Sequence, residues 1–275
     1  MTADPTKPTP PEVYEAVLVP AVLVPLTRFV VDLAAPREGE RVLDLACGTG
    51  IAARTVAPIV GSSGTVVGVD VAPPMLEVAR SLPPPEGATI EWREGDASAL
   101  VLPDASFDVV VCQQGLQFFP DRAATAAEVL RVLAPGGRFV AAVWQGIDRQ
   151  PFWKGFSEVE ARNLAPLGLT IEDARLPFSW GDAEPLRSLL EEAGFSSIEL
   201  STAMVMANFA AEGFVENLEY PYGALVHGFL EDPDAFAAFV DAVKEQSRDV
   251  LESYRREDRI IFETPANLVI AHRPA

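Results

Sequence analysis

Three aspartates, Asp44, Asp70 and Asp96, interrupt or end successive short apolar runs of the sequence. Between the first two, Cys47-Gly48-Thr49-Gly50 predicts a turn whose glycines let the backbone pass close to a ligand. The helix expected over Ile51–Val60 would direct its free N–H groups and positive end at the same ligand. Asp70 then arrives at the end of the next run, where nucleoside-binding α/β folds hold a ribose diol. The spacing therefore predicts a nucleoside site at one edge of a parallel sheet.

The residue types in this stretch narrow the choice of nucleoside. The run Arg41–Gly50 reads Arg-Val-Leu-Asp-Leu-Ala-Cys-Gly-Thr-Gly, which resembles motif I of the class I S-adenosylmethionine-dependent methyltransferases. Gly95-Asp96-Ala97 resembles the position at which these enzymes recognise the adenine amino group. The run Glu128–Gly137 resembles the stretch before the fifth strand in the ubiquinone/menaquinone-type enzymes. The resemblance covers residues 40–145 and implies methyl transfer from S-adenosylmethionine to a small organic acceptor.

A dinucleotide-binding enzyme is the main alternative. The run Gly48–Ala53 also satisfies the pattern G-x-G-x-x-G/A, which is typical of nicotinamide-dependent oxidoreductases. Asp44 argues against that function, because a carboxylate inside the first strand suits an ammonium-bearing ligand and would repel a pyrophosphate. These turns also offer no cationic residue to neutralise phosphates. A non-catalytic protein that binds S-adenosylmethionine is the second alternative.

The resemblance implies a role for individual residues, and each role has a structural alternative. Gly48 and Gly50 would support the methionine moiety, although a tight turn needs glycine in any case. Asp70 would bind the ribose or cap the following helix, and Asp96 would bind the adenine or form a turn. Met75 would lie against the adenine or in the core. The other residues expected at the cofactor are Tyr14, Asp44, Ala46, Thr49, Val71, Ala97, Gln113 and Gln117.

Charge and composition argue against several classes of partner. The 275 residues carry 40 acidic and 21 basic side chains, a net charge of −19. Nucleic-acid backbones require clustered Lys and Arg and anionic membranes repel such a field, so we expect neither partner. The segment Met1–Pro11 lacks the features of a signal peptide and the two cysteines indicate no disulfide framework, which predicts a cytoplasmic location. The apolar stretch Val17–Leu26, interrupted by Pro20 and Pro25, predicts a kinked helix too short to span a bilayer.

Alternating strand and helix patterns predict an α/β fold. We expect a Rossmann-like sheet of seven mostly parallel strands with helices on both faces and an antiparallel last strand. The expected strands are 41–46, 65–70, 89–93, 107–113, 137–143, 196–207 and 268–273. Along the chain we expect a cover segment (1–36), a cofactor-binding core (37–208), a helical lid at the substrate (209–264) and the last strand of the core (265–275). Within the lid, Pro233–Tyr254 has the apolar spacing of a helix.

Histidine is the natural general base near neutral pH, and the chain has two. His272 lies near the end of the chain and is expected to be structural, so His227 in the lid is the catalytic candidate. Its alternative is a packed side chain, and transfer would then rely on proximity alone. Zinc-type Cys/His spacing and paired metal-binding acids are absent, so no metal is predicted. Lid aromatics such as Phe214, Tyr222 and Phe239 predict an apolar or aromatic acceptor, whereas the oligomeric state stays open.

Overall fold

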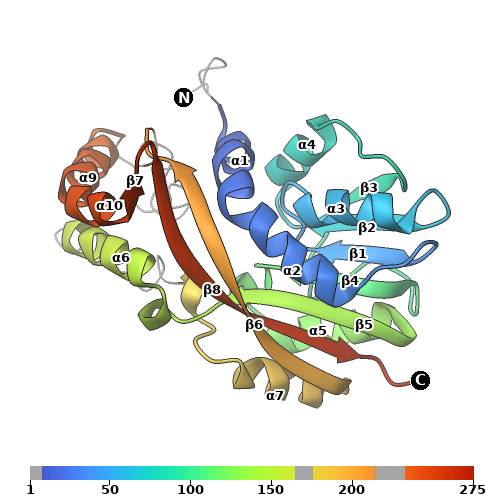
Figure 1. Cartoon of the computed structure of the whole chain (residues 1–275). Helices are drawn as coiled ribbons and strands as arrows, with labels where there is room; N and C mark the ends of the chain where they lie inside the picture. The colour runs from blue at the N-terminus through green and yellow to red at the C-terminus, as the bar shows by residue number, and fades with distance from the viewer. Residues whose placement is uncertain (1–7, 165–175, 213, 215–232) are drawn as a thin grey trace.

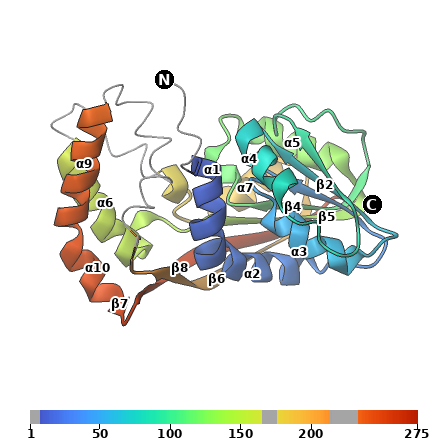
Figure 2. The same cartoon turned by 90° about the horizontal axis from the view of Figure 1, so that it is seen from above.

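The computed structural model describes residues 8–164, 176–212, 214 and 233–275, with the backbone alone over 233–237. Its centre is a mixed sheet in the order β3-β2-β1-β4-β5-β8-β6, and a short β7 pairs with β8. Helices cover both faces of this sheet, and a second group of helices stands beyond one end of it (Figure 1, Figure 2). The α/β class and the mostly parallel sheet with an antiparallel last strand are confirmed.

The first five strands run parallel, and β8 is antiparallel to both of its long neighbours, β5 and β6. Leu43 in the central strand is paired with Val67 on one side and Val110 on the other. Such apolar runs suit a sheet that is covered on both faces. The strands are β1 (Arg41–Leu45), β2 (Thr65–Asp70), β3 (Ile90–Glu94), β4 (Phe107–Gln113), β5 (Leu133–Trp144), β6 (Ser196–Ala210), β7 (Arg255–Arg256) and β8 (Arg259–His272).

The helices begin and end at residues whose chemistry favours a boundary. Gly50 precedes α3 in a left-handed conformation, Gly61 follows it, and the Asp121 carboxylate caps α5 by accepting from the Ala124 N–H at 2.9 Å. The helices are α1 (Pro10–Val13), η1 (Tyr14–Leu23), α2 (Val24–Ala34), α3 (Ile51–Val60), α4 (Pro73–Ser81), η2 (Leu116–Phe118), α5 (Arg122–Val132), η3 (Ile147–Arg149), α6 (Pro151–Leu164), η5 (Leu176–Phe178), α7 (Glu184–Ala193), α9 (Pro233–Gln246) and α10 (Arg248–Tyr254).

Strands β6 and β8 continue beyond the sheet as a two-stranded arm. β8 pairs with β5 only over Ala266–His272, whereas it pairs with β6 from Arg259 onward. The part of β8 beyond β5, together with Met204–Ala210 of β6, therefore projects from the sheet and meets α6 and α10, and α9 packs on α6 (Figure 1). Phe152 of α6 stacks on Phe262 of β8 with ring centroids 3.8 Å apart, which anchors these helices on the arm.

The N-terminal cover is one continuous helix, Pro10–Ala34, whose middle turns are π-helical. Wider turns accommodate Pro20, which has no N–H to donate to an α-helical ladder. The expectation of a short helix is therefore wrong. An 18-residue window of this helix has a mean hydropathy of 1.9, and the helix is long and apolar enough to cross a membrane by length and composition alone. This is weak evidence for a span, because 44% of that window is buried inside the protein, as in a core helix.

Other boundaries also differ from the sequence-based expectation. β8 begins at Arg259 rather than at residue 268, because Ile260 and Phe262 are buried and continue the pairing with β6. The helix expected over 233–254 is divided at Ser247 into α9 and α10. The short β7 brings the sheet to eight strands instead of seven. These changes lengthen the arm and leave the first five strands in their expected order along the chain.

Candidate functional site

The site begins where β1 ends in a sharp turn. Ala46 and Gly48 adopt positive φ values of 56° and 55°. Asp44 is 1% exposed, and its Oδ2 accepts a hydrogen bond from the Ala53 N–H of α3 at 2.8 Å. Burial raises the pKa of the Asp44 carboxyl to about 7. At neutral pH this group therefore lies between its two protonation states, and an adjacent ammonium would favour the carboxylate.

Asp70 at the end of β2 is directed at the same turn. Its Oδ2 accepts from the Gly48 N–H at 2.7 Å, and its Oδ1 accepts from the Ala72 N–H at 2.9 Å. The Tyr14 hydroxyl of η1 also lies over the turn, since a Cβ added to Gly48 would be 3.7 Å from it. Burial raises the pKa of Asp70 and that of Tyr14, and the carboxyls of Asp70 and Asp44 raise the Tyr14 pKa further. The structure thus brings these predicted residues together.

The Trp92 indole of β3 explains two glycines near the turn. A Cβ added to Gly50 would lie 2.1 Å from this ring, and one added to Gly68 would lie 2.5 Å from it. Gly50 also has a φ of 86°, which disfavours any other residue. Sequence reasoning missed Trp92. The available signal was Gly68, because a glycine inside an apolar strand marks a close approach by another group.

The N-terminal helix is held over the site by polar contacts. Arg54 of α3 pairs with Glu15 of η1 at 2.8 Å, and its guanidinium also donates to the Thr49 carbonyl. From the other side, Gln113 at the end of β4 donates its Nε2 to the Leu23 carbonyl at 3.3 Å. These contacts tie η1 to α3 and to the carboxyl end of β4.

The residues expected at the adenine lie on a more exposed rim. The Asp96 Oδ1 accepts from the Ser98 N–H at 2.8 Å and from its hydroxyl at 2.7 Å, and these bonds lower the Asp96 pKa. Val71 is 70% exposed, Met75 is half-buried and Ala97 is buried. The turn-forming role of Asp96 is therefore present in the structure, and its role at an adenine stays a prediction.

Buried polar atoms at this edge fit a nucleoside that carries an ammonium group. The Thr49 Oγ1 and the Gln113 Oε1 are buried without a hydrogen-bond partner. Such atoms are uncommon in folded proteins, and the ammonium and hydroxyls of S-adenosylmethionine would supply partners. In the parts of the chain that the structure describes, no group of three or more His, Cys, Asp and Glu residues is placed to hold a metal ion.

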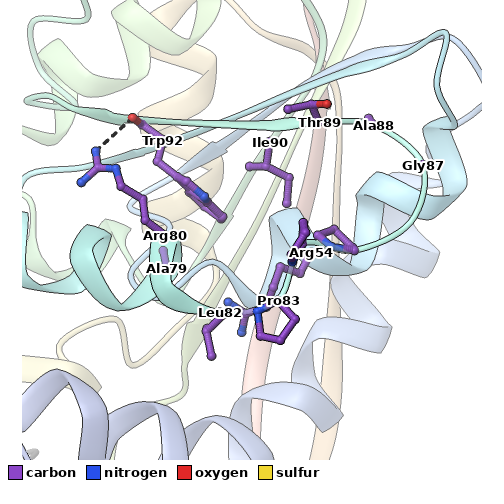
Figure 3. Close-up of a pocket in the computed structure, with 12 residues that line it drawn as sticks. Arg54, Ala79, Arg80, Leu82, Pro83, Gly87, Ala88, Thr89, Ile90 and Trp92 are labelled. Carbon is purple, nitrogen blue, oxygen red and sulfur yellow. Dashed lines mark hydrogen bonds between the residues drawn. The ribbon is translucent and has the colours of Figure 1, made fainter.

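A separate cavity of about 310 Å³ lies between α3, α4 and β3 (Figure 3). Arg54, Arg80 and Trp92 are among the residues that line it, and the Arg80 Nη2 donates to the Trp92 carbonyl at 3.1 Å. None of the three aspartates at the strand ends lines this cavity. The nucleoside site that the sequence predicts is therefore distinct from it.

Several predictions about the lid concern residues that the structure leaves out. His227 and Tyr222 lie outside the described residues. The described aromatics serve packing: Phe214 is 2% exposed and its ring centroid lies 4.9 Å from that of Phe209, while Phe239 packs against the core. Glu160 of α6 is 4% exposed, its Oε2 has no hydrogen-bond partner, and burial raises its pKa to about 8.

Gln117, the remaining predicted residue, is 1% exposed and belongs to a polar cluster beside the turn. Its Nε2 donates to the Gln114 Oε1 at 2.6 Å. The main-chain carbonyl of Gln117 accepts a hydrogen bond from Arg122, whose guanidinium lies over the Trp180 ring. Sequence reasoning did not identify Gln114, Arg122 or Trp180, because no spacing pattern connects them.

Comparison with known proteins supports the cofactor predicted from the turn. Residues 43–141 match the family model described as a methyltransferase domain. The chain is 37% identical over 180 residues to the demethylmenaquinone methyltransferase of Thermus thermophilus, which covers 62% of this chain and 80% of that relative. It is 40% identical over 115 residues to the nocamycin O-methyltransferase of Saccharothrix syringae, or 42% of this chain and 41% of that relative.

The fold is also similar to those of solved methyltransferase structures. The phosphoethanolamine N-methyltransferase 2 of Haemonchus contortus, solved with S-adenosyl-L-methionine, superposes with a TM-score of 0.58 at 20% identity, over 99% of this chain and 59% of that one. The fold, the turn between Asp44 and Asp70 and the sequence relatives agree. The chain belongs to the class I S-adenosylmethionine-dependent methyltransferases of the ubiquinone/menaquinone C-methyltransferase type, and it is an enzyme that methylates small molecules.

Proposed function

We propose that this enzyme binds S-adenosylmethionine at the carboxyl ends of β1, β2 and β3 and methylates an apolar or aromatic acceptor. The observation that carries the proposal is the pair of desolvated carboxyls at the turn: Asp44, which is buried and accepts from the Ala53 N–H, and Asp70, which is half-buried and accepts from the Gly48 N–H. Neither carboxyl takes part in an ion pair within the described residues, and burial raises the pKa of both. A cationic ligand with a diol would offset that cost.

Each group at the turn receives one part of the cofactor in this proposal. Asp44 and the backbone of Gly48 and Gly50 hold the methionine end, since the ammonium complements the acid. Asp70 accepts hydrogen bonds from the ribose hydroxyls with the lone pairs that Gly48 and Ala72 leave free. The rim holds the adenine, with Asp96 at its amino group, Met75 at its face, and Val71 and Ala97 beside them.

The protein's own task is positioning. S-adenosylmethionine supplies a methyl group on a sulfonium, which makes the thioether a good leaving group. The Tyr14 hydroxyl and the N-terminal helix cover the turn and exclude water from it. Gln113 at the end of β4 and Gln117 in the following η2 orient cofactor and acceptor. In-line placement of the acceptor atom then supplies much of the rate enhancement.

The acceptor and the base are inferred from the relatives and the sequence. One relative is named for a quinone precursor and another for O-methylation, so the acceptor class we favour is a phenol, quinol or enol of apolar character. His227 is the proposed general base, and His227→Gln should then lower kcat with little change in KM. The net charge of −19 supports an enzyme that binds neither nucleic acid nor an anionic membrane, the features of Met1–Pro11 and of the two cysteines support a cytoplasmic location, and metal is not part of the proposed chemistry.

Two titrations and one turnover assay test the proposal. Calorimetry should show S-adenosylhomocysteine binding in the micromolar range and no comparable binding of NAD⁺. Incubation with methyl-labelled S-adenosylmethionine and a reduced naphthoquinone should transfer label to the organic product. Tight NAD⁺ binding without S-adenosylhomocysteine binding would establish the oxidoreductase alternative. Cofactor binding without label transfer to any of a panel of phenols, quinols and enols would favour a non-catalytic binding protein.

A further inference from the structure

The polar cluster after β4 contains several buried side-chain nitrogen and oxygen atoms that have no hydrogen-bond partner. Gln114, Gln117, Arg122 and Trp180 are linked to one another through two hydrogen bonds and a ring contact. In each of the four, one side-chain polar atom is buried without a hydrogen-bond partner: Gln114 Nε2, Gln117 Oε1, Arg122 Nε and Trp180 Nε1. Gln117 is 1% exposed and Trp180 is 4% exposed. Leaving such groups unpaired costs about 1–3 kcal/mol each, so a ligand that pairs with them gains correspondingly.

The donors outnumber the acceptors in this set. Arg122 and Trp180 each present an N–H, and the two amides together present one further donor and one acceptor. That balance does not depend on how the amides are oriented, because exchanging the oxygen and nitrogen of both leaves the same two functions free. A group that accepts two or three hydrogen bonds and donates one matches the cluster.

Arg122 adds a positive charge that the described residues do not neutralise. Its Nη2 donates to the Gln117 carbonyl at 3.1 Å and to the Ser179 hydroxyl at 3.4 Å, and its guanidinium carbon lies 4.6 Å from the Trp180 ring centre. These partners are uncharged, and burial lowers the Arg122 pKa. Arg122 also opens α5, where the positive end of the helix disfavours a cation. The adjacent Asp121 carboxylate is engaged as the helix cap at the Ala124 N–H.

The cluster adjoins the cofactor turn. Gly115, between the two glutamines, has no room for a side chain, because a Cβ there would lie 2.7 Å from the Ala46 Cβ. Gln114 has a φ of 59° and its N–H bonds to the Ala142 carbonyl at 2.8 Å, so it sits where β4 and β5 end together. An acceptor held here would lie next to the turn that carries the proposed cofactor.

We propose that Gln114, Gln117, Arg122 and Trp180 form the acceptor subsite and select acceptors that carry an anionic oxygen beside a hydroxyl, as in a hydroxyaryl carboxylate or an enolised dicarbonyl. The inference rests on the proposed function and adds the chemistry of the acceptor. Arg122 and Trp180 donate to the anionic oxygen, and Gln117 accepts from the neighbouring hydroxyl. The charge is thereby held beside the methyl group, while the apolar part of the acceptor faces away from Arg122.

The test uses the full chain saturated with S-adenosylhomocysteine and a matched pair of probes. Calorimetry with 1-hydroxy-2-naphthoate and its uncharged amide should give at least about tenfold tighter binding of the carboxylate. Arg122→Met should abolish this preference, and Trp180→Phe, which keeps an aromatic ring but removes the indole N–H, should weaken binding of the carboxylate probe by several-fold. Arg28→Met, which removes an exposed arginine from α2, is the control and should keep the preference.

The outcomes separate this proposal from the cofactor proposal. The affinity for S-adenosylhomocysteine, measured first in each variant, reports folding and the cofactor site, and should stay within about twofold of the parent. Equal binding of the two probes, binding of neither up to about 10 mM, or a preference that survives Arg122→Met would overturn the subsite. Loss of S-adenosylhomocysteine binding in the parent protein would instead overturn the proposed function.

Discussion

The two carboxyls of the glycine turn differ from ordinary surface acids because each is desolvated. Asp44 is 1% exposed and is hydrogen-bonded to the Ala53 N–H, while Asp70 bonds to the Gly48 and Ala72 N–H groups. Burial outweighs these bonds and raises both pKa values. The turn is therefore prepared for a cation before the ligand arrives.

Replacement of Asp70 with alanine tests the ribose contact. The Asp70→Ala variant should lose about 1.5–3 kcal/mol of S-adenosylhomocysteine affinity, because charge-assisted hydrogen bonds to the diol disappear. Asp32→Ala, which removes an exposed acid of α2, should bind like the parent. Calorimetry measures both, and thermal unfolding verifies that the variants are folded. An unchanged affinity in folded Asp70→Ala would reduce Asp70 to a cap for the turn.

The raised pKa of Asp44 predicts how the affinity for S-adenosylhomocysteine depends on pH. In the free protein its pKa is about 7, so its carboxyl is largely protonated below that value. A bound ammonium group lowers this pKa, and binding must then release a proton. The affinity for S-adenosylhomocysteine should therefore rise between about pH 6 and about pH 8, by up to about tenfold per unit on the acid side. In Asp44→Asn the affinity should vary much less with pH, and a parent protein with a flat profile would contradict the assignment.

At this scale the sequence located the glycine turn with its aspartates but not the polar cluster after β4. The turn is encoded in consecutive residues, so the run Arg41–Gly50 and Asp70 were sufficient to find it. The pairing of Arg122 with Trp180 joins two segments far apart in the chain, and only the fold brings them within 4.6 Å. Single-sequence patterns carry no signal for such a contact.

Among the elements, β3 packs against the start of α3 through the Trp92 ring. Gly50→Ala should lower the free energy of unfolding by about 1–3 kcal/mol for the clash with Trp92 and a similar amount for the left-handed backbone, and should weaken cofactor binding. Adding Trp92→Ala should relieve the steric part only, so the two changes should be non-additive in denaturant unfolding. Simple additivity would show that the ring does not limit this position.

Helix α6 carries a buried acid whose effect on stability has a definite sign. The pKa of Glu160 is raised from 4.5 to about 8, so the native state holds this proton more tightly than the unfolded state. Stability should therefore fall as pH rises through this window, with a slope of up to about 1.4 kcal/mol per pH unit. Glu160→Gln should remove this slope and raise Tm near pH 8, whereas Glu158→Gln, at an exposed position of the same helix, should not. Equal pH profiles for the parent and Glu160→Gln would contradict the burial.

The hydrophobic pattern of the sequence predicted the strands and helices of the core, but it predicted those of the arm only in part. Strands with both faces covered are unmistakable apolar runs, and glycine or proline marks their ends. The start of β8 was missed because its apolar run, Ile260–Phe262, is only three residues long and is followed by Glu263, Thr264 and Pro265, and proline is uncommon inside a strand. The π-helical turns around Pro20 were missed because proline ordinarily ends a helix.

At the scale of the whole molecule, the N-terminal helix and the β6–β8 arm flank the carboxyl edge of the parallel strands. The N-terminal helix lies against β6 and α3, and α6, α9 and α10 stand on the far side of this helix from α3 and α4 (Figure 2). The turn belongs to the sheet alone. Cofactor binding is therefore expected to depend on the sheet and its glycine turn, and choice of acceptor on the polar cluster after β4 together with the elements that flank this edge. The family relationship extends over the core and accounts for the shared cofactor.

The most direct test is a crystal structure of the full chain with S-adenosylhomocysteine. The account predicts that the ribose hydroxyls lie within hydrogen-bond distance of Asp70, that the ammonium faces Asp44, and that the adenine lies beside Asp96 and Met75. The sulfur should then point toward Gln114 and Gln117. A nucleoside bound instead in the cavity lined by Arg54, Arg80 and Trp92, or a ribose remote from Asp70, would contradict the central claim.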